Sequence, residues 1–356
     1  MEHRSPSEEE CRPGNGVSGL LLPALLCGGI VAMGLLNLGS RKPASWMQQV
    51  PVLAASPSAR PGVSLLVFES DSARGLSAVL DAAWSSPGAG DAIPNLAPLR
   101  LPPDMDELDR EAKKDAFFRA LAPHVLAANR KIRADRARLR DVREHVRAGR
   151  NLTADQEDFL VRLADRYRVG EGGQGELLAR GPEGLLEELW GRADVVPPSL
   201  ALAQGAIESA WGSSRFARLG NSLFGQWVFS ADKGMAPLFR EEGANYSVAR
   251  FVDIAEAVEA YMHNLNTLWA YEEFRAIRKG MRETGQPLDP RALAEGLLLY
   301  SVRREEYVEE VRTVVRDNRL ESFDGRRLAR LGESVWNTVL AELEEVPSFR
   351  VILLPE

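Results

Sequence analysis

The stretch from Pro197 to Gly225 reads PPSLALAQGAIESAWGSSRFARLGNSLFG and carries one carboxylate, Glu208, near the end of an apolar segment. The two prolines at its start suit the first positions of a helix, where no amide hydrogen is needed, and Gly212 provides a stop one turn beyond the glutamate. Between these limits apolar residues recur every three or four positions, as on a buried helix face. The stretch therefore predicts a central helix that carries Glu208 close to its C-terminal end.

The neighbours of Glu208 suggest what this carboxylate does. Gln204 lies one helical turn before it and Trp211 follows shortly after, so we expect the glutamate to lie beside a wide aromatic surface. Poor hydration disfavours the charged form of a carboxylate and raises its pKa. A glutamic acid of this kind can donate a proton near neutral pH. Taken by itself, the glutamate also fits an exposed charge on an amphipathic helix.

The string AIESAWGSSRFARLGNSLFGQW, residues 206–227, resembles the glutamate-containing signature of glycoside hydrolase family seventy-three, and most closely its Bax-like branch. The resemblance implies a mainly α (α+β) fold: a lysozyme-like helical domain with a small β-hairpin lobe. It also implies that Glu208 is the catalytic acid of a bacterial β-N-acetylglucosaminidase that cuts peptidoglycan. The expected activity is that of an endo-enzyme cleaving the GlcNAc-β-1,4-MurNAc bond.

The same resemblance supplies further candidates for the site. The string LLLYSVRREEYVEEVRTVVRDNRL is also similar to the Bax-like branch, which implies a substrate-side tyrosine at Tyr307, with Tyr300 two turns before it. In relatives the second catalytic carboxylate lies on the β-lobe, where this chain has Ser247; Glu241 and Glu242 on the same predicted hairpin are the candidates to replace it. Alternatively, the 2-acetamido group of the substrate attacks in place of an enzyme carboxylate. The expected substrate-binding residues are Gln204, Trp211, Asn221, Phe224, Gly225, Trp227, Ser247 and Tyr300.

Two other functions stay open at this point. A lytic transglycosylase, which would leave anhydro-muramyl ends, is one alternative, and the serine at position 247 also fits a catalytically impaired glycan-binding or cell-envelope scaffold protein. No cofactor is expected, and no metal, because the four histidines are scattered without paired ligand spacing. A net charge of -7 argues against nucleic acid as a partner and provides no overall attraction to an acidic cell-wall polymer.

The N-terminal region predicts export. After a polar tail over residues 1–16, residues 17–38 form a 22-residue run without a charge, long enough to span a bilayer as a signal anchor. A cleaved signal peptide and a buried core helix are the alternatives. We expect a single-pass protein of the inner membrane whose catalytic domain faces the periplasm or cell wall. Its expected partners are peptidoglycan glycan strands and the membrane; protein partners are unknown.

The remaining chain divides by composition. Residues 39–97 are rich in Pro, Ala and Ser and predict a linker, inside which 63–68 and 75–83 could form a short strand and a helix. Residues 98–326 are the expected catalytic domain, and 327–356 a C-terminal helix and tail. Within the catalytic domain we expect helices broken at Pro123, a helix capped by Thr153, short strands between 226 and 251, and helices over 253–268, 287–300 and 305–320.

Overall fold

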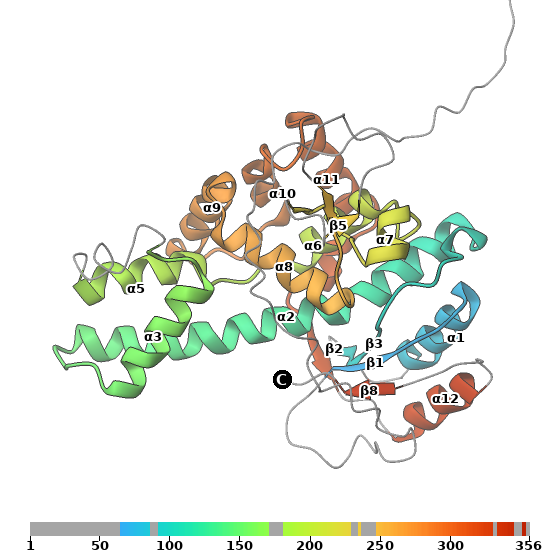
Figure 1. Ribbon diagram of the computed structural model, residues 1–356, viewed down its shortest axis with the longest axis horizontal. Coiled ribbons are helices and arrows are strands. Elements are labelled where there is room, and N and C mark those ends of the chain that lie inside the picture. Colours follow the sequence, from blue (N-terminus) through green and yellow to red (C-terminus); the bar gives the residue numbers. More distant parts are fainter. Residues whose placement is uncertain are drawn as a thin grey trace, which may run out of the picture.

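The computed structural model describes residues 65–85, 92–170, 181–228, 234–235, 247–329, 333–344 and 351–353. The predicted polar tail, the predicted membrane anchor over 17–38, and the candidate carboxylates Glu241 and Glu242 lie outside these residues. Within them, no helix combines the length and the apolar character that crossing a bilayer requires. The described part of the chain is mainly helical, as the sequence predicts (Figure 1).

The central helix is α6, which spans Pro198–Ser209. It is surrounded by α2 (Arg110–Arg147), α11 (Glu305–Asp317) and the short helix η7 (Leu320–Phe323). Most of its residues are buried, because an apolar helix enclosed on several sides has little surface left for water. The proline-led start and the end near Gly212 are both as predicted.

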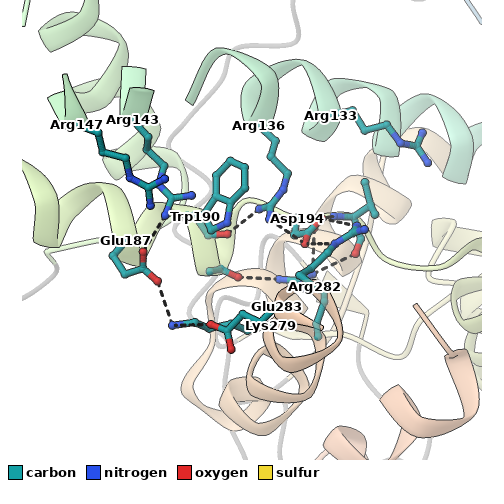
Figure 2. A pocket seen from close by; sticks show the side chains of 13 residues that line it. Arg133, Arg136, Arg143, Arg147, Glu187, Trp190, Asp194, Lys279, Arg282 and Glu283 are labelled. Atoms are coloured by element: carbon teal, nitrogen blue, oxygen red, sulfur yellow. Dashed lines mark hydrogen bonds and ion pairs between the residues drawn. The ribbon is translucent and has the colours of Figure 1, made fainter. Parts of the chain in front are cut away.

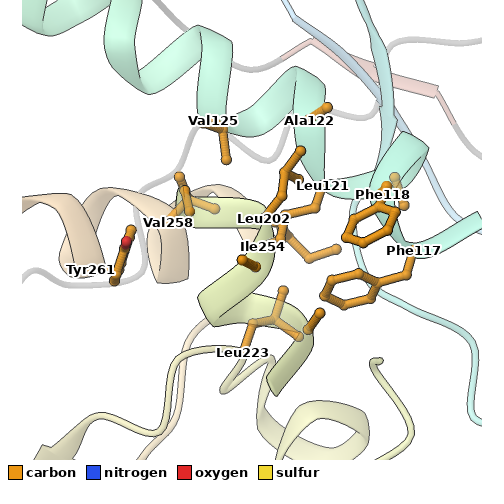
Figure 3. Packing of buried hydrophobic residues seen from close by; sticks show 14 of the residues in the cluster. Phe117, Phe118, Leu121, Ala122, Val125, Leu202, Leu223, Ile254, Val258 and Tyr261 are labelled. Atoms are coloured by element: carbon orange, nitrogen blue, oxygen red, sulfur yellow. The ribbon is translucent and has the colours of Figure 1, made fainter. Parts of the chain in front are cut away.

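One glycine sets how closely α6 and α2 approach. A Cβ atom at Gly205 would lie 2.8 Å from Cδ2 of Leu121, well inside normal contact. Phe117, Leu121 and Val125 of α2 pack near Leu202 of α6 in the interior (Figure 3). The glycine therefore allows an intimate contact between the helix that carries Glu208 and the longest helix of the molecule.

The rest of the helical core follows α6 in the sequence. Asp253 caps α8, as its side chain accepts a hydrogen bond from the backbone of Glu256. The predicted helix over 253–268 is confirmed, with its inward residues buried. The following elements are α8 (Ile254–Thr267), η5 (Trp269–Tyr271), α9 (Glu272–Glu283), α10 (Pro290–Leu293) and η6 (Ala294–Leu297).

Helix α2 differs from its prediction, because it runs unbroken through Pro123 for 38 residues. Proline lacks the amide hydrogen of the helical ladder and usually costs about 3 kcal/mol inside a helix. Here Leu121, Ala122, His124 and Val125 are all buried on either side of it. Burial of these side chains on several faces offsets the lost hydrogen bond, an effect that a local pattern does not reveal.

The C-terminal half of α2 forms an arm with two other helices (Figure 1). Helix α3 (Ala154–Arg166) begins with the predicted cap, in which Thr153 and Gln156 bond each other's backbone. Helix α5 (Gly181–Arg192) follows. Leu139, Leu160 and Leu189 lie in a small apolar cluster that holds the arm together.

The predicted linker is folded where the structure describes it. Strand β1 (Leu66–Phe68) pairs in parallel with β3 (Leu96–Pro98) and antiparallel with β8 (Val351–Leu353). Strand β2 (Ala92–Pro94) pairs in parallel with β7 (Arg327–Ala329), so the first part of the predicted C-terminal helix is a strand. Helix α1 (Ala73–Trp84) packs against α2 and α12 (Glu333–Glu344), and η3 (Met105–Glu107) precedes α2. The pairings of β1 with β8 and of β2 with β7 each join segments more than 200 residues apart, which local composition does not indicate.

The predicted β-lobe is present as three short antiparallel strands. They are β4 (Trp227–Val228), β5 (Gly234–Met235) and β6 (Ser247–Ala249), with β6 in the middle. The short helix α7 (Arg215–Gly220) connects the end of α6 to this lobe. The lobe therefore lies next in the chain after Glu208, as the sequence predicts.

Candidate active site

The chain reverses direction directly after Glu208. Helix α6 ends at Ser209, and the next three residues, Ala210, Trp211 and Gly212, all have positive φ, at 50°, 58° and 82°. Positive φ costs energy for alanine and tryptophan, and such strain gathers at functional sites. The hydroxyl of Ser209 stabilises the reversal by accepting a hydrogen bond from the Gly212 amide at 2.8 Å. Glu208 is thereby fixed in the last turn of the central helix.

The backbone of Gly225 lies against the Glu208 carboxyl group. A Cβ atom at this position would lie 2.9 Å from Oε2 of Glu208, and the residue has φ of 63°. Both facts favour glycine, which has no side chain and adopts positive φ at little cost. The turn of the Asn-Ser-Leu-Phe-Gly segment thus forms one wall around the carboxyl.

A chain of hydrogen bonds under α6 orients the carboxylate. The Tyr261 hydroxyl donates to Oε1 of Gln204 at 2.7 Å, and Nε2 of Gln204 donates to the Tyr307 hydroxyl at 2.9 Å. The Tyr307 hydroxyl in turn donates to the Glu208 carboxylate. All three supporting side chains are buried, so the chain is shielded from competing water.

Stacked aromatic rings support the same region. The Tyr300 and Tyr307 rings are parallel within 4°, with centroids 5.4 Å apart, and the Phe224 ring stacks on Tyr261 at 4.1 Å. The Tyr300 hydroxyl donates to the carbonyl oxygen of Phe224 at 2.8 Å. This bond holds the backbone directly before Gly225, and hence the wall beside Glu208.

These surroundings make Glu208 a weak acid. Burial raises the pKa of the Glu208 carboxyl to about 7, and the nearby Glu310 charge adds to the rise. The Tyr307 hydrogen bond and the Arg303 charge lower the pKa, but by less than burial raises it. The side chain as a whole is half-buried, so it keeps some exposed surface even though protein surrounds the carboxyl. Near neutral pH the group can therefore both hold and release a proton.

Sequence reasoning missed Tyr261, which donates to Gln204, and two charged residues of this site, Arg303 and Glu310. The two charged residues form an ion pair with each other, and the Arg303 guanidinium lies 5.8 Å from the centroid of the Tyr307 ring. Both influence the pKa of Glu208. Glu310 lies three residues after Tyr307 on α11, a spacing that places both on one helix face, whereas Arg303 lies in the turn before α11, where helical spacing gives no signal.

The predicted site residues fall into two groups. The structure brings Glu208, Gln204, Phe224, Gly225, Tyr300 and Tyr307 together. Gln204, Phe224, Tyr300 and Tyr307 are buried, and the bonds above engage their polar groups, which favours support of Glu208 over direct substrate contact.

The other predicted residues have different surroundings in the described structure. Trp211 packs edge-on against Phe117 and Phe118 of α2, so the aromatic surface around Glu208 is formed by tyrosines instead. Asn221 ends α7, and its amide donates to the carbonyl oxygens of Phe251 and Val252. Trp227 and Ser247 lie on β4 and β6, where Ser247 is buried.

A weakly acidic glutamic acid at the end of a central helix, beside a small β-lobe, is typical of glycosidases that protonate a leaving oxygen. A family model described as Glucosaminidase, mannosyl-glycoprotein endo-beta-N-acetylglucosaminidase, matches residues 185–320. Protein bax of Escherichia coli (strain K12) is 31% identical over 206 residues, which are 58% of this chain and 70% of that protein. No solved structure matches the chain. The chain belongs to glycoside hydrolase family seventy-three, in its Bax-like branch.

Proposed function

We propose that this protein hydrolyses the GlcNAc-β-1,4-MurNAc bond of peptidoglycan, with Glu208 as the general acid. The observation that carries the proposal is the state of Glu208, whose carboxyl pKa is raised to about 7 while Tyr307 and Gly225 fix its position. An ordinary glutamate is almost fully ionised at neutral pH and could not donate a proton there. Membership of the glucosaminidase family supports the substrate class.

The proposed reaction needs one proton transfer in each direction. Glu208 donates its proton to the glycosidic oxygen as the bond to the anomeric carbon breaks. Water then adds to the anomeric carbon, and its proton returns to the Glu208 carboxylate. Tyr307 keeps the carboxyl oriented through its hydrogen bond. The group that assists the anomeric carbon is Glu241, Glu242 or the 2-acetamido group of the substrate itself.

Digestion of purified sacculi tests the proposal. The fragments are reduced with borohydride and analysed by mass spectrometry. Reduced GlcNAc ends are expected, whereas 1,6-anhydro-muramyl ends would identify a lytic transglycosylase. Rates with Glu241→Gln and Glu242→Gln separate the assisting groups, because unchanged rates in both would indicate the acetamido-assisted route.

A glycan-binding scaffold is the second candidate, and Ser247 favours it. This residue is buried on β6, at the position to which the resemblance to Bax-like proteins assigns the second carboxylate. A scaffold would retain sacculus binding and would release no new reducing ends at any enzyme concentration. The proposed substrate is a cell-wall polymer, so either function places the described domain outside the cytoplasm.

A further inference from the structure

A second site lies at the opposite end of α6 from Glu208. A cavity of about 670 Å³ opens between α2, α5 and α9, and it includes Asp194 and Val195, just before α6 begins. Seven cationic side chains and three carboxylates line it. This local excess of positive charge occurs on a chain whose net charge is -7. We call this cavity the basic pocket.

Four of the cations lie along one side of α2. Arg133, Arg136, Arg143 and Arg147 follow each other at intervals of three, seven and four residues, so their side chains share a helix face. Figure 2 shows them in a row, with Lys279 and Arg282 of α9 across the cavity. The charges therefore surround a concave space.

Some of these cations have structural partners. Asp194 is buried and accepts hydrogen bonds from Arg282 through both carboxylate oxygens, each at 3.0 Å, and Arg136 lies 3.3 Å away. Glu187 pairs with Arg143 and with Lys279, each at 3.0 Å. The three carboxylates thus leave most of the positive charge uncompensated.

Arg133 and Arg147 remain available. Both are exposed, and neither has an ion pair or a hydrogen bond with any described residue. Although Arg133 keeps exposed surface, partial desolvation of its guanidinium lowers its pKa, and repulsion from Arg282 lowers it further. An anion in the basic pocket would relieve this repulsion, because an opposite charge stabilises the protonated form.

Trp190 holds two of the arginines of the basic pocket in place. Its ring lies between Arg136 and Arg143, whose guanidinium carbons are 3.7 and 4.3 Å from the ring centroid. Arg136 also donates to the carbonyl oxygens of Trp190 and Ala193. A stacked guanidinium keeps a fixed donor geometry, which suits two-point recognition of carboxylates and other planar or tetrahedral oxyanions.

The position of the pocket suggests a polymer as the ligand. Helix α6 has 12 residues and so separates the basic pocket from Glu208 by roughly 18 Å. A peptidoglycan strand carries peptide stems with several carboxylates, and it is long enough to reach both places. The exposed large apolar residues of the described chain lie elsewhere: none of Val161, Leu219, Val252, Trp269, Leu298 and Val302 lines the pocket. A concave basic site without an apolar rim fits a soluble peptide better than a lipid surface.

We propose that the basic pocket binds the carboxylates of peptidoglycan peptide stems and so positions the glycan strand for cleavage at Glu208. This inference rests on the proposed function, which supplies the substrate. It also explains how a protein with a net negative charge could hold an acidic polymer, because the interaction is local and screening restricts it to short distances.

The test measures binding without turnover. Binding of the full chain with Glu208→Gln is measured by isothermal titration calorimetry with soluble glycan strands that carry their stems, and with strands whose stems an amidase has removed. The probe variant adds Arg133→Gln and Arg147→Gln. The matched control instead adds Arg110→Gln and Arg162→Gln, two exposed arginines outside the pocket with the same change in charge.

We expect loss of the stems to weaken binding of the control about tenfold, as removal of one or two charge pairs would. The probe variant should bind stem-bearing strands about tenfold less tightly than the control, and stem-free strands equally well. Raising the salt concentration should reduce the difference between the variants. Circular dichroism melts that coincide for probe and control establish that both are folded.

Three results would overturn the inference. The first is equal binding of probe and control to stem-bearing strands, and the second is equal binding of the control to strands with and without stems. The third is a charge-dependent difference that appears on vesicles containing anionic phospholipid instead of on glycan strands. Failure of the proposed function gives a different result. If the wild-type chain binds through stems but releases no reducing ends, the inference about the basic pocket stands and the proposed hydrolase activity is wrong.

Discussion

At the scale of the residue, Glu208 shows how burial and hydrogen bonding oppose each other. Burial raises the pKa of its carboxyl to about 7, and the Tyr307 hydroxyl lowers it by stabilising the anion. The balance leaves an acid that is about half protonated at neutral pH. This single feature decides how activity and stability depend on pH.

Activity should fall as the pH rises through about 7. A general acid works only while it is protonated, so kcat/KM for soluble glycan fragments should be level at lower pH and decline above the Glu208 pKa. Glu208→Gln should reduce kcat/KM by about 10² to 10⁴. An activity that instead increases through pH 7 would assign Glu208 the role of a base.

Tyr307→Phe should move the decline of kcat/KM to higher pH. The variant removes a hydrogen bond that favours the carboxylate, so the pKa of Glu208 should increase. Tyr167→Phe, another buried tyrosine but in the helical arm, is the control and should leave the profile in place. A profile that stays unchanged in Tyr307→Phe would show that the hydrogen bond does not tune Glu208.

Glu208 should also destabilise the folded state above neutral pH. Its pKa is raised in the folded state from 4.5 to about 7, so the folded state binds more protons in that window and stability decreases as the pH rises through it. Full expression of the shift would correspond to about 3 kcal/mol, and partial solvation reduces this. Urea unfolding at pH 8 should therefore give Glu208→Gln about 2 kcal/mol more stability than the wild type, with less gain at pH 5. Glu107→Gln, on the surface, should show no such difference.

At the scale of the element, glycines decide how helices and loops meet the site. The sequence predicts α6 and its end near Gly212 because prolines, apolar spacing and a glycine are local signals. The sequence does not reveal that Gly205 and Gly225 allow close packing. The atoms that they approach belong to Leu121 and to Glu208, respectively, which come from other segments. The break predicted at Pro123 was wrong for the same reason, because tertiary burial outweighed a local rule.

Gly225→Ala should remove activity while costing little stability. A methyl group there would lie 2.9 Å from the Glu208 carboxyl and displace it. Gly285→Ala is a matched control, because Gly285 has a similar φ of 67° and nothing within 4 Å. Both variants should lose about 1 kcal/mol from the left-handed conformation, and only Gly225→Ala should lose more than tenfold in kcat. Equal activities of Gly225→Ala and Gly285→Ala would show that the backbone at Gly225 does not position the Glu208 carboxyl.

At the scale of the whole molecule, the catalytic region does not end where the family match ends. The match covers residues 185–320, yet α6 packs on α2, which lies before that range. Segments from both ends of the described chain join in one small unit, where α1 packs on α12 and β1 pairs with β8. The sequence predicts a linker over 39–97 in which 63–68 could form a strand and 75–83 a helix. It does not reveal that this strand pairs with β8, because the two segments lie far apart along the chain.

This arrangement predicts that damage to the terminal unit unfolds the catalytic core with it. Trp336 of α12 is 5% exposed and belongs to the same apolar cluster as Phe117 and Leu202. Trp336→Ala should therefore cost about 3 to 4 kcal/mol, whereas Trp269→Ala, at a residue that is 63% exposed, should be nearly neutral. If the cluster is one cooperative unit, thermal unfolding of Trp336→Ala should remain a single transition at lower Tm, with loss of sacculus digestion at that same temperature. A separate early transition that leaves digestion intact would mean that the terminal unit folds apart from the site, because cooperativity between them requires the shared core.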